Sequence, residues 1–153
     1  MKEILFTLNG NQVAVPTNGH ERLLDMLRTK CGAVEVKEGC GEGECGACTV
    51  LLDGLPITSC TMFAFQVHGR TVTTVKGVDA RRLDAISEAM VGAGAVQCGF
   101  CTPGFVLTIY ALLEDNPKPT RQGIQEALAG NLCRCTGYER IFVAVEALAG
   151  GAS

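Results

Sequence analysis

The sequence predicts an α+β fold, in which a β-rich first half is followed by a helical second half. Two observations carry this prediction. Short aliphatic and β-branched runs separated by turn signals occupy the chain up to about residue 78. From residue 79 onward the composition shifts to Ala, Leu, Glu and Met in segments of helical length. We therefore expect two domains, at residues 1–78 and 79–153, with their boundary near residues 77–80.

The first half is expected to form a small mixed sheet crossed by one helix. Asn9-Gly10 has the chemistry of a hairpin turn, and Asp53-Gly54 is a second turn signal. The helix is predicted at residues 21–30, where leucines recur at helical spacing and Gly32 follows as a stop. The predicted strands are residues 3–9, 12–15, 49–52 and 70–76.

Four helices are predicted in the second half. Thr102 is expected to cap the second of them, with Pro103 at its first position, and Thr120 to cap the third. Helices joined by such short links are typical of a small bundle. Their predicted ranges are residues 82–91, 103–114, 121–129 and 139–148.

Charge and hydropathy exclude several classes of partner. The net charge is −3, and no Lys/Arg run exceeds the pair Arg81-Arg82, which argues against nucleic acid and anionic membranes as partners. The longest nearly apolar stretch, residues 100–113, is shorter than the roughly 20 residues of a membrane span. The N-terminus lacks the layout of a secretory signal, so we expect a cytoplasmic protein. An apolar fraction of 47% with only 19% charged residues favours a permanent partner subunit.

Nine cysteines in 153 residues are the most informative feature of the composition. Disulfides would require an oxidising compartment, but the number is odd and no export signal is evident. In a reducing compartment, clustered thiols are more often metal ligands. Eight of the nine fall into two quartets, which are Cys40, Cys45, Cys48 and Cys60, and Cys98, Cys101, Cys133 and Cys135.

The first quartet has the Cys-x4-Cys-x2-Cys spacing, with a distant fourth cysteine, of plant-type [2Fe–2S] ferredoxins. Its loop, GCGEGECGAC at residues 39–48, is rich in glycine. Glycines let the backbone bend sharply and approach the inorganic sulfides, and their N–H groups can donate to sulfur. A phosphate-binding loop would end in Gly-Lys-Ser/Thr, and zinc ribbons usually pair Cys-x2-Cys knuckles, so both alternatives fit poorly.

The second quartet is ambiguous by spacing alone. Cys98 and Cys101 are separated by 31 residues from the Cys133-x-Cys135 pair, and four thiolates suit zinc as well as iron. Both pairs are expected at helix starts, where the partial positive charge of the helix favours thiolates. That placement suits either metal, so the residues leave the choice open.

Three motifs together resemble the small iron–sulfur subunit of the molybdenum hydroxylases, the xanthine oxidase family. They are GCGEGECGAC at residues 39–48, QCGFCTPG at 97–104 and GNLCRCTGY at 130–138, with all eight cysteines in register. The resemblance implies a plant-ferredoxin-like β-grasp domain followed by a four-helix bundle domain. It also implies two [2Fe–2S] clusters, a molybdopterin cofactor in a large partner subunit and FAD in a medium one. The implied assembly is a heterotrimer or a dimer of heterotrimers.

The resemblance also assigns roles to single residues. Cys98, Cys101, Cys133 and Cys135 would ligate the cluster nearer molybdenum, and the first quartet would ligate the cluster nearer the flavin. Gln97 and Cys135 would lie beside the pterin, where an amide supplies both a donor and an acceptor. Without the resemblance, Gln97 would be interpreted as an ordinary polar residue at a helix end.

The remaining conspicuous residues have plainer interpretations. We expect Cys31 to be a packed thiol and His20 and His68 to be surface or loop histidines. Arg134 would offset cluster charge, bind a partner carboxylate or form a structural salt bridge. Glu42 and Glu44 are expected to be solvated loop charges that lower the potential of the nearby cluster.

The predicted function is electron relay within a molybdenum-containing oxidoreductase. Electrons would pass singly from the second-quartet cluster to the first-quartet cluster and on to FAD, with no substrate chemistry on this chain. A free-standing ferredoxin-type carrier is the first alternative, although a carrier would need only the first domain. The second alternative is a zinc-stabilised structural module, which the spacing of the first quartet disfavours.

Overall fold

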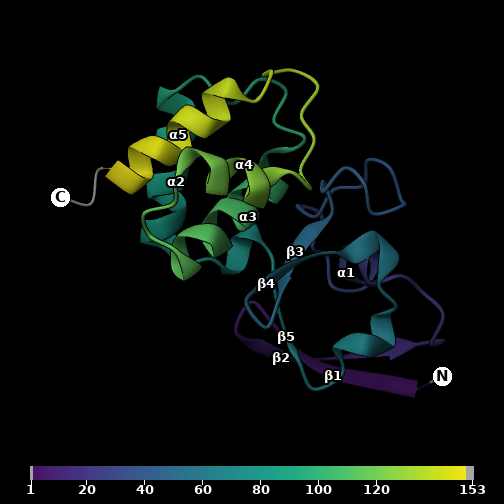
Figure 1. Ribbon diagram of the computed structural model, residues 1–153. Coiled ribbons are helices and arrows are strands. Elements are labelled where there is room, and N and C mark those ends of the chain that lie inside the picture. Colours follow the sequence, from purple (N-terminus) through teal and green to yellow (C-terminus); the bar gives the residue numbers. More distant parts are fainter. Residues whose placement is uncertain (1, 151–153) are drawn as a thin grey trace.

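The computed structural model describes residues 2–150 and divides the chain into a sheet part and a helical part (Figure 1). Five strands and one short helix build the first part, and four helices build the second. The predicted α+β class is thus confirmed, and the change in composition near residue 79 coincides with the change from strands to helices.

The sheet is mixed, and its strand order is β2-β1-β5-β3-β4. Strand β1 pairs antiparallel with β2 through the predicted turn, with Leu8 opposite Asn11, and parallel with β5. The second hairpin joins β3 to β4, a strand that the sequence did not predict because it has only four residues and begins with Leu-Pro. The strands are β1 (Lys2–Leu8), β2 (Asn11–Thr17), β3 (Thr49–Leu52), β4 (Leu55–Thr58) and β5 (Thr71–Thr73).

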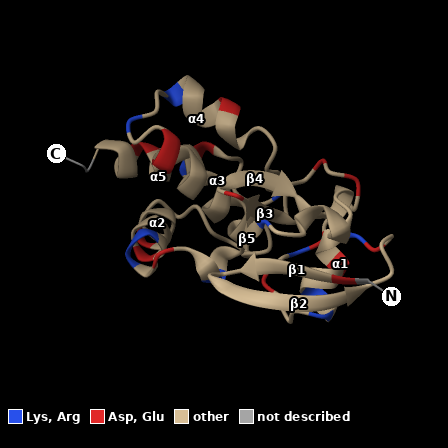
Figure 2. Ribbon diagram, turned by 90° about the horizontal axis from the view of Figure 1, so that it is seen from below, with Lys and Arg blue, Asp and Glu red and all other residues tan. Residues whose placement is uncertain are grey.

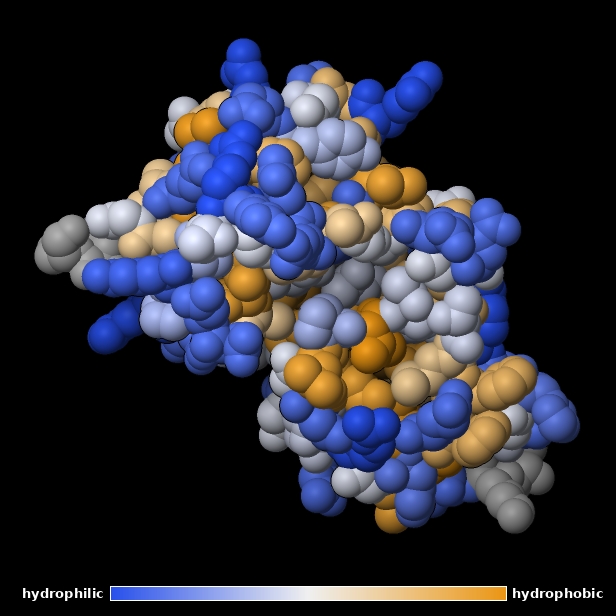
Figure 3. Space-filling model, viewed as in Figure 1, coloured by the Kyte–Doolittle hydropathy of each residue, from blue (hydrophilic) through white to orange (hydrophobic). Residues whose placement is uncertain are grey.

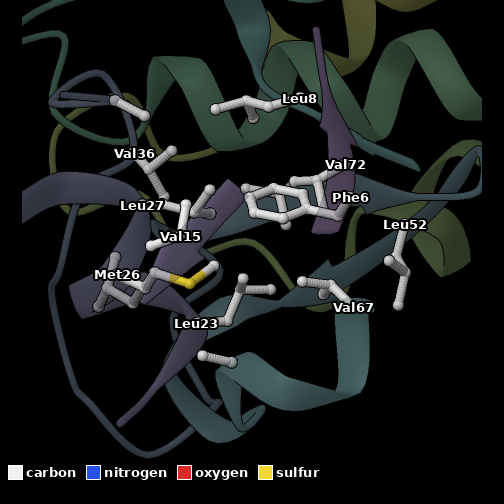
Figure 4. Close-up of a cluster of buried hydrophobic side chains, with 14 of the residues drawn as sticks. Phe6, Leu8, Val15, Leu23, Met26, Leu27, Val36, Leu52, Val67 and Val72 are labelled. Atoms are coloured by element: carbon white, nitrogen blue, oxygen red, sulfur yellow. The ribbon is translucent and has the colours of Figure 1, made fainter. Parts of the chain in front are cut away.

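The helix α1 (Leu23–Thr29) supplies the main apolar contacts to this sheet (Figure 4). Leu23, Met26 and Leu27 are fully buried and face Phe6 and neighbouring side chains of the strands. Burial of each such side chain stabilises the fold by about 1.5–3 kcal/mol. The predicted helix at 21–30 is therefore confirmed, and a small aliphatic core compensates for the scarcity of aromatic residues.

The predicted strand at 70–76 is shorter in the structure and ends at Thr73. The next residue, Thr74, forms hydrogen bonds with side chains instead of pairing with a neighbouring strand. Its backbone N–H donates to Asn9 Oδ1 at 2.8 Å, and its hydroxyl donates to Glu35 Oε1 at 2.7 Å. Lys76 then forms an ion pair with the other Glu35 oxygen at 3.1 Å. A 3-10 turn at Val75–Gly77 replaces the end of the strand. The link to the helical part is thereby anchored to the sheet.

The helical part consists of α2 (Ala80–Gly92), α3 (Thr102–Asp115), α4 (Arg121–Leu128) and α5 (Glu139–Gly150), close to the predicted ranges. Thr120 caps α4 by accepting from the Gly123 N–H, as expected. The predicted cap of α3 is wrong in detail. Cys101 occupies the N-cap without a side-chain cap bond, Thr102 is the first helical residue, and Pro103 follows it.

The two parts pack against each other through α3 and β3. Leu107 of α3, Leu51 of β3 and Val78 of the link form a buried cluster that belongs to both parts. At the same junction, apolar atoms gather in the waist between the two parts (Figure 3). Part of this waist is a groove between the β3–β4 turn and α3, lined by Leu55, Pro56 and Leu112. The two parts are therefore joined by a small buried apolar cluster of their own.

Lys and Arg positions and Asp and Glu positions are scattered along the ribbon, with no continuous basic stripe in the view of Figure 2. This distribution agrees with the net charge of −3. None of the helices within residues 2–150 combines the length and apolar character that crossing a membrane requires.

Candidate metal centres

The first quartet gathers at the loop between α1 and β3. Cys40, Cys45 and Cys48 come from this loop, and Cys60 joins them from a 3-10 turn directly after β4. Cys48 and Cys60 are buried, whereas Cys40 and Cys45 are half-buried. The β3–β4 hairpin accounts for the fourth position, because the Ser59 N–H and hydroxyl both bond to the Cys48 carbonyl, at 3.3 and 2.7 Å. The distant fourth cysteine is thus brought to the loop by strand pairing.

Backbone N–H groups of the glycine-rich loop converge on the sulfur of Cys40. The donors are Glu42 at 3.5 Å, Glu44 at 3.3 Å and Cys45 at 3.4 Å. Hydrogen bonds from Glu42 and Cys45 are the main causes that lower the pKa of the Cys40 thiol to about 6. Donors placed in this way stabilise a thiolate, which is the form that binds iron.

The four thiols of the first quartet are arranged as two pairs. The Cys40 sulfur accepts the Cys45 N–H at 3.4 Å and lies close enough to the Cys45 thiol to influence its own pKa, and the thiols of Cys48 and Cys60 interact in the same way. Burial, followed by the bond and charge of Cys48, raises the pKa of Cys60 to about 11. The charge of Cys40 adds to this increase, so the two pairs lie close enough to interact.

The second quartet lies at the N-terminal side of α3 and α5. Cys98 and Cys101 precede α3, and Cys133 and Cys135 lie in the loop between α4 and α5. The expected helix-start placement holds for Cys101, which is the N-cap of α3. Cys135 leads into α5, as expected, but a bend at Thr136 and a turn at Gly137 and Tyr138 separate it from the first helical residue, Glu139.

These four thiols are also arranged as two pairs. The Cys135 and Cys98 sulfurs are 3.7 Å apart, and Cys101 shares a hydrogen bond with Cys133. Burial and the neighbouring Cys133 raise the pKa of Cys101 to about 12. Burial opposes ionisation of Cys133, but hydrogen bonds from Thr136, Cys135 and Cys101 together outweigh it and lower the pKa of this thiol. The Thr136 hydroxyl and N–H lie 3.1 and 3.4 Å from the Cys133 sulfur.

Two pairs of thiols in each quartet match the ligand requirement of a [2Fe–2S] cluster, in which four cysteines hold two irons. The N–H donors on Cys40 and Cys133 are of the kind that tunes iron–sulfur potentials. The residues present therefore fit two-iron clusters in both places.

The two quartets border one cavity of about 240 Å³. Cys45 lines it from the first quartet and Cys98, Cys101, Cys133 and Cys135 from the second, with the side chains of Phe100 and Leu132 among the lining. The Leu132 N–H also donates to the Cys45 carbonyl at 2.9 Å. Since Leu132 directly precedes Cys133, this hydrogen bond links the backbone at a first-quartet cysteine directly to the backbone beside a second-quartet cysteine.

The structure also places the other residues that the sequence singled out. Gln97 Nε2 donates to the Cys135 carbonyl at 3.0 Å, beside the exposed sulfurs of Cys98 and Cys135. Arg134 is exposed and has no ion pair within residues 2–150, so its interpretation as a structural salt bridge is wrong. Cys31 packs against the apolar core between α1 and the sheet, where burial raises the pKa of its thiol. His68 Nδ1 accepts the Leu5 N–H at 3.1 Å.

Sequence reasoning missed two residues next to the second quartet. Tyr138 has a positive φ of 70°, unusual for an aromatic residue, and its hydroxyl accepts the Cys133 N–H at 3.1 Å. Asn131 is a buried amide between the two parts of the chain. Both residues lie within the GNLCRCTGY segment. A polar residue next to a cysteine ligand carries no sequence signal that shows which distant residues it will contact.

Comparison with known proteins agrees with two iron–sulfur sites. Residues 6–64 match the family model described as a 2Fe-2S iron-sulfur cluster binding domain, and residues 74–146 match the [2Fe-2S] binding domain. The nicotinate dehydrogenase small FeS subunit of Eubacterium barkeri is 50% identical over 143 residues, which cover 93% of this chain and 91% of that protein. The nicotine 6-hydroxylase small subunit of Paenarthrobacter nicotinovorans is 45% identical, covering 94% and 87%.

Solved structures show the same architecture. Quinoline 2-oxidoreductase from Pseudomonas putida 86 matches with a TM-score of 0.91 and 39% identity, over 98% of this chain and 94% of that one. The aldehyde oxidoreductase of Desulfovibrio gigas matches with the same TM-score and 36% identity, but this chain spans only 17% of it. The chain carries two [2Fe–2S] clusters, and the choice between zinc and iron is settled for iron. It belongs to the family of small iron–sulfur subunits of the molybdenum hydroxylases and serves as their electron-transfer component.

Proposed function

We propose that Cys40, Cys45, Cys48 and Cys60 ligate one cluster and that Cys98, Cys101, Cys133 and Cys135 ligate the other. The observation that carries this assignment is the division of each quartet into two neighbouring thiol pairs. One pair per iron is the arrangement that a [2Fe–2S] cluster requires. We divide the chain correspondingly into residues 1–78 and 79–153, one cluster in each domain.

The second cluster is the end of the relay that faces the large subunit. Its support is exposure, since Cys98 and Cys135 are the exposed cysteines among the eight. Gln97 uses its amide N–H₂ on the Cys135 carbonyl, which leaves the amide oxygen available to accept from a bound pterin. Gln97 and Cys135 would thus contact a molybdopterin held by the large subunit, where the molybdenum centre would supply the substrate oxidation.

The first cluster is the end that faces an FAD-binding medium subunit. This chain's contribution is to ligate the clusters, to hold them apart at a fixed separation and to set their potentials through N–H donors. The chain itself performs no substrate chemistry in this proposal. The assembly would be a heterotrimer or a dimer of heterotrimers in the cytoplasm, as expected for a chain related to proteins described as small subunits.

The experiment that tests this proposal is anaerobic reduction of the complex purified with this chain. Nicotinate and an aldehyde serve as separate probes, because relatives are described as a nicotinate dehydrogenase and an aldehyde oxidoreductase. Reduction of both clusters by one of these probes, in a preparation that contains two larger chains, is the expected result.

Two outcomes would contradict the proposal. A chain that purifies alone and exchanges electrons with soluble reductases would favour the free-standing carrier. A complex whose clusters are reduced by dithionite but by neither probe, although its molybdenum centre is reduced, would show that electrons do not enter this chain from the large subunit.

A further inference from the structure

A buried amide joins the loop of the first quartet to the helices that carry the second. The side chain of Asn131 donates through Nδ2 to the Gly46 carbonyl at 3.3 Å and to the Thr49 hydroxyl at 3.5 Å. Its Oδ1 accepts the hydroxyl of Thr108, in α3, at 2.8 Å. Asn131 is only 4% exposed, so these bonds are protected from water.

An amide is suited to this position because it supplies donors and an acceptor from one small group. The Gly46 carbonyl can only accept a hydrogen bond, so it selects the orientation of the amide, with the N–H₂ toward the first quartet and the oxygen toward α3. The Thr108 hydroxyl lies 2.8 Å from that oxygen and 3.1 Å from the Gly104 carbonyl. A buried polar group that loses its hydrogen-bond partner destabilises the fold. A fully bonded amide therefore favours the one arrangement of loop and helices in which all its bonds are made. The contact therefore specifies a geometry as well as adding stability.

The backbone beside this amide carries the direct link between the quartets. Gly46 follows Cys45, and Leu132 follows Asn131, so the amide lies next to the bond from the Leu132 N–H to the Cys45 carbonyl. The approach is close, because a Cβ at Gly46 would collide with the Gly130 carbonyl and one at Gly104 with the Gly46 carbonyl. A small displacement of the loop would break the Leu132–Cys45 bond.

We propose that Asn131 is a positioning residue for electron transfer between the two clusters. It holds the Cys45–Gly46 peptide against the Asn131–Leu132 peptide and so fixes the separation and orientation of the clusters. In the transfer itself one electron leaves the reduced second cluster and enters the oxidised first cluster, without bond or proton exchange. The proposal rests on the ligand assignment given above.

The test uses Asn131→Ala and Thr108→Val in the complex purified with this chain. Asn131→Ala removes the amide, whereas Thr108→Val keeps the side-chain shape and removes only the hydroxyl, which bonds to the Asn131 oxygen and to the Gly104 carbonyl. Asn116→Ala is the matched control, because Asn116 is exposed and, within residues 2–150, its side chain bonds only to the Lys118 N–H two residues away. Iron content, paramagnetic resonance of the reduced clusters and amide hydrogen exchange are measured for each.

We expect both variants to keep the iron content of the unchanged chain and to alter the magnetic interaction between the two reduced clusters. The Leu132 amide should exchange faster by about 5- to 150-fold, the factor that corresponds to one lost buried hydrogen bond. Electron passage to the first cluster should slow. The Asn116→Ala control should match the unchanged chain in all three measurements.

Two results would overturn the proposal. The first is an unaltered magnetic interaction and Leu132 exchange rate in variants with full iron. The second is loss of iron from both variants, which would show that the amide holds a cluster rather than positions the pair. A failure of the ligand assignment looks different, since the unchanged chain would then lack one of its two clusters.

Discussion

Replacement of Gly46 by alanine is expected to destabilise the protein by roughly 2–5 kcal/mol. Gly46 has φ +68°, which an L-residue adopts at a cost, and its added Cβ would meet the Gly130 carbonyl and the Asn131 backbone. Backbone atoms cannot rotate away as a flexible side chain can. The loop must therefore separate from the helices, and thermal unfolding of the purified complex measures the loss.

Gly69→Ala is the matched control for this prediction. Gly69 has a similar φ of +73°, but a Cβ there would meet nothing within 4 Å. Both variants carry the conformational cost of about 1–2 kcal/mol, and only Gly46→Ala carries the collision. Equal destabilisation by the two substitutions would show that the close approach between loop and helices does not contribute to stability.

Cys133→Ala is expected to halve the iron content of the chain. Cys133 is half-buried, is paired with Cys101 and has a lowered pKa, which makes it a ready thiolate ligand. Its loss should remove the second cluster and leave the first, so the paramagnetic signal of one centre should vanish. Electron flow from the large subunit should stop, and Cys135→Ala should behave in the same way.

Cys31→Ala provides the control because it removes a thiol that packs against the first core outside both quartets. It should keep full iron and both signals, with at most a modest loss of stability. Full iron in Cys133→Ala and in Cys135→Ala would refute the ligand assignment of the second quartet.

Local sequence signals predicted most of the elements, because those elements depend on neighbours in the chain. The Asn9-Gly10 turn, the leucines of α1 and the Thr120 cap each act over a few residues. The predicted strand at 70–76 was too long, since Thr74 is drawn away by the side chains of Asn9 and Glu35. Partners so distant in sequence leave no periodic signal.

In the candidate sites, too, features that depend on neighbouring residues could be predicted, and features that depend on distant residues could not. Spacing and glycine content identified the first cluster, because three of its cysteines share one loop. Spacing alone leaves the metal of the second quartet open, since Cys98 and Cys135 meet only when α3, α4 and α5 pack. The contacts of Asn131 cross 85 residues to Gly46, so no local pattern could reveal them.

The most direct test of the account is the metal content of the purified chain, measured together with paramagnetic resonance after reduction. We expect a red-brown protein with about four irons per chain, two for each cluster, and two distinguishable paramagnetic centres. A colourless protein with stoichiometric zinc, or a protein with two irons and one centre, would contradict this expectation.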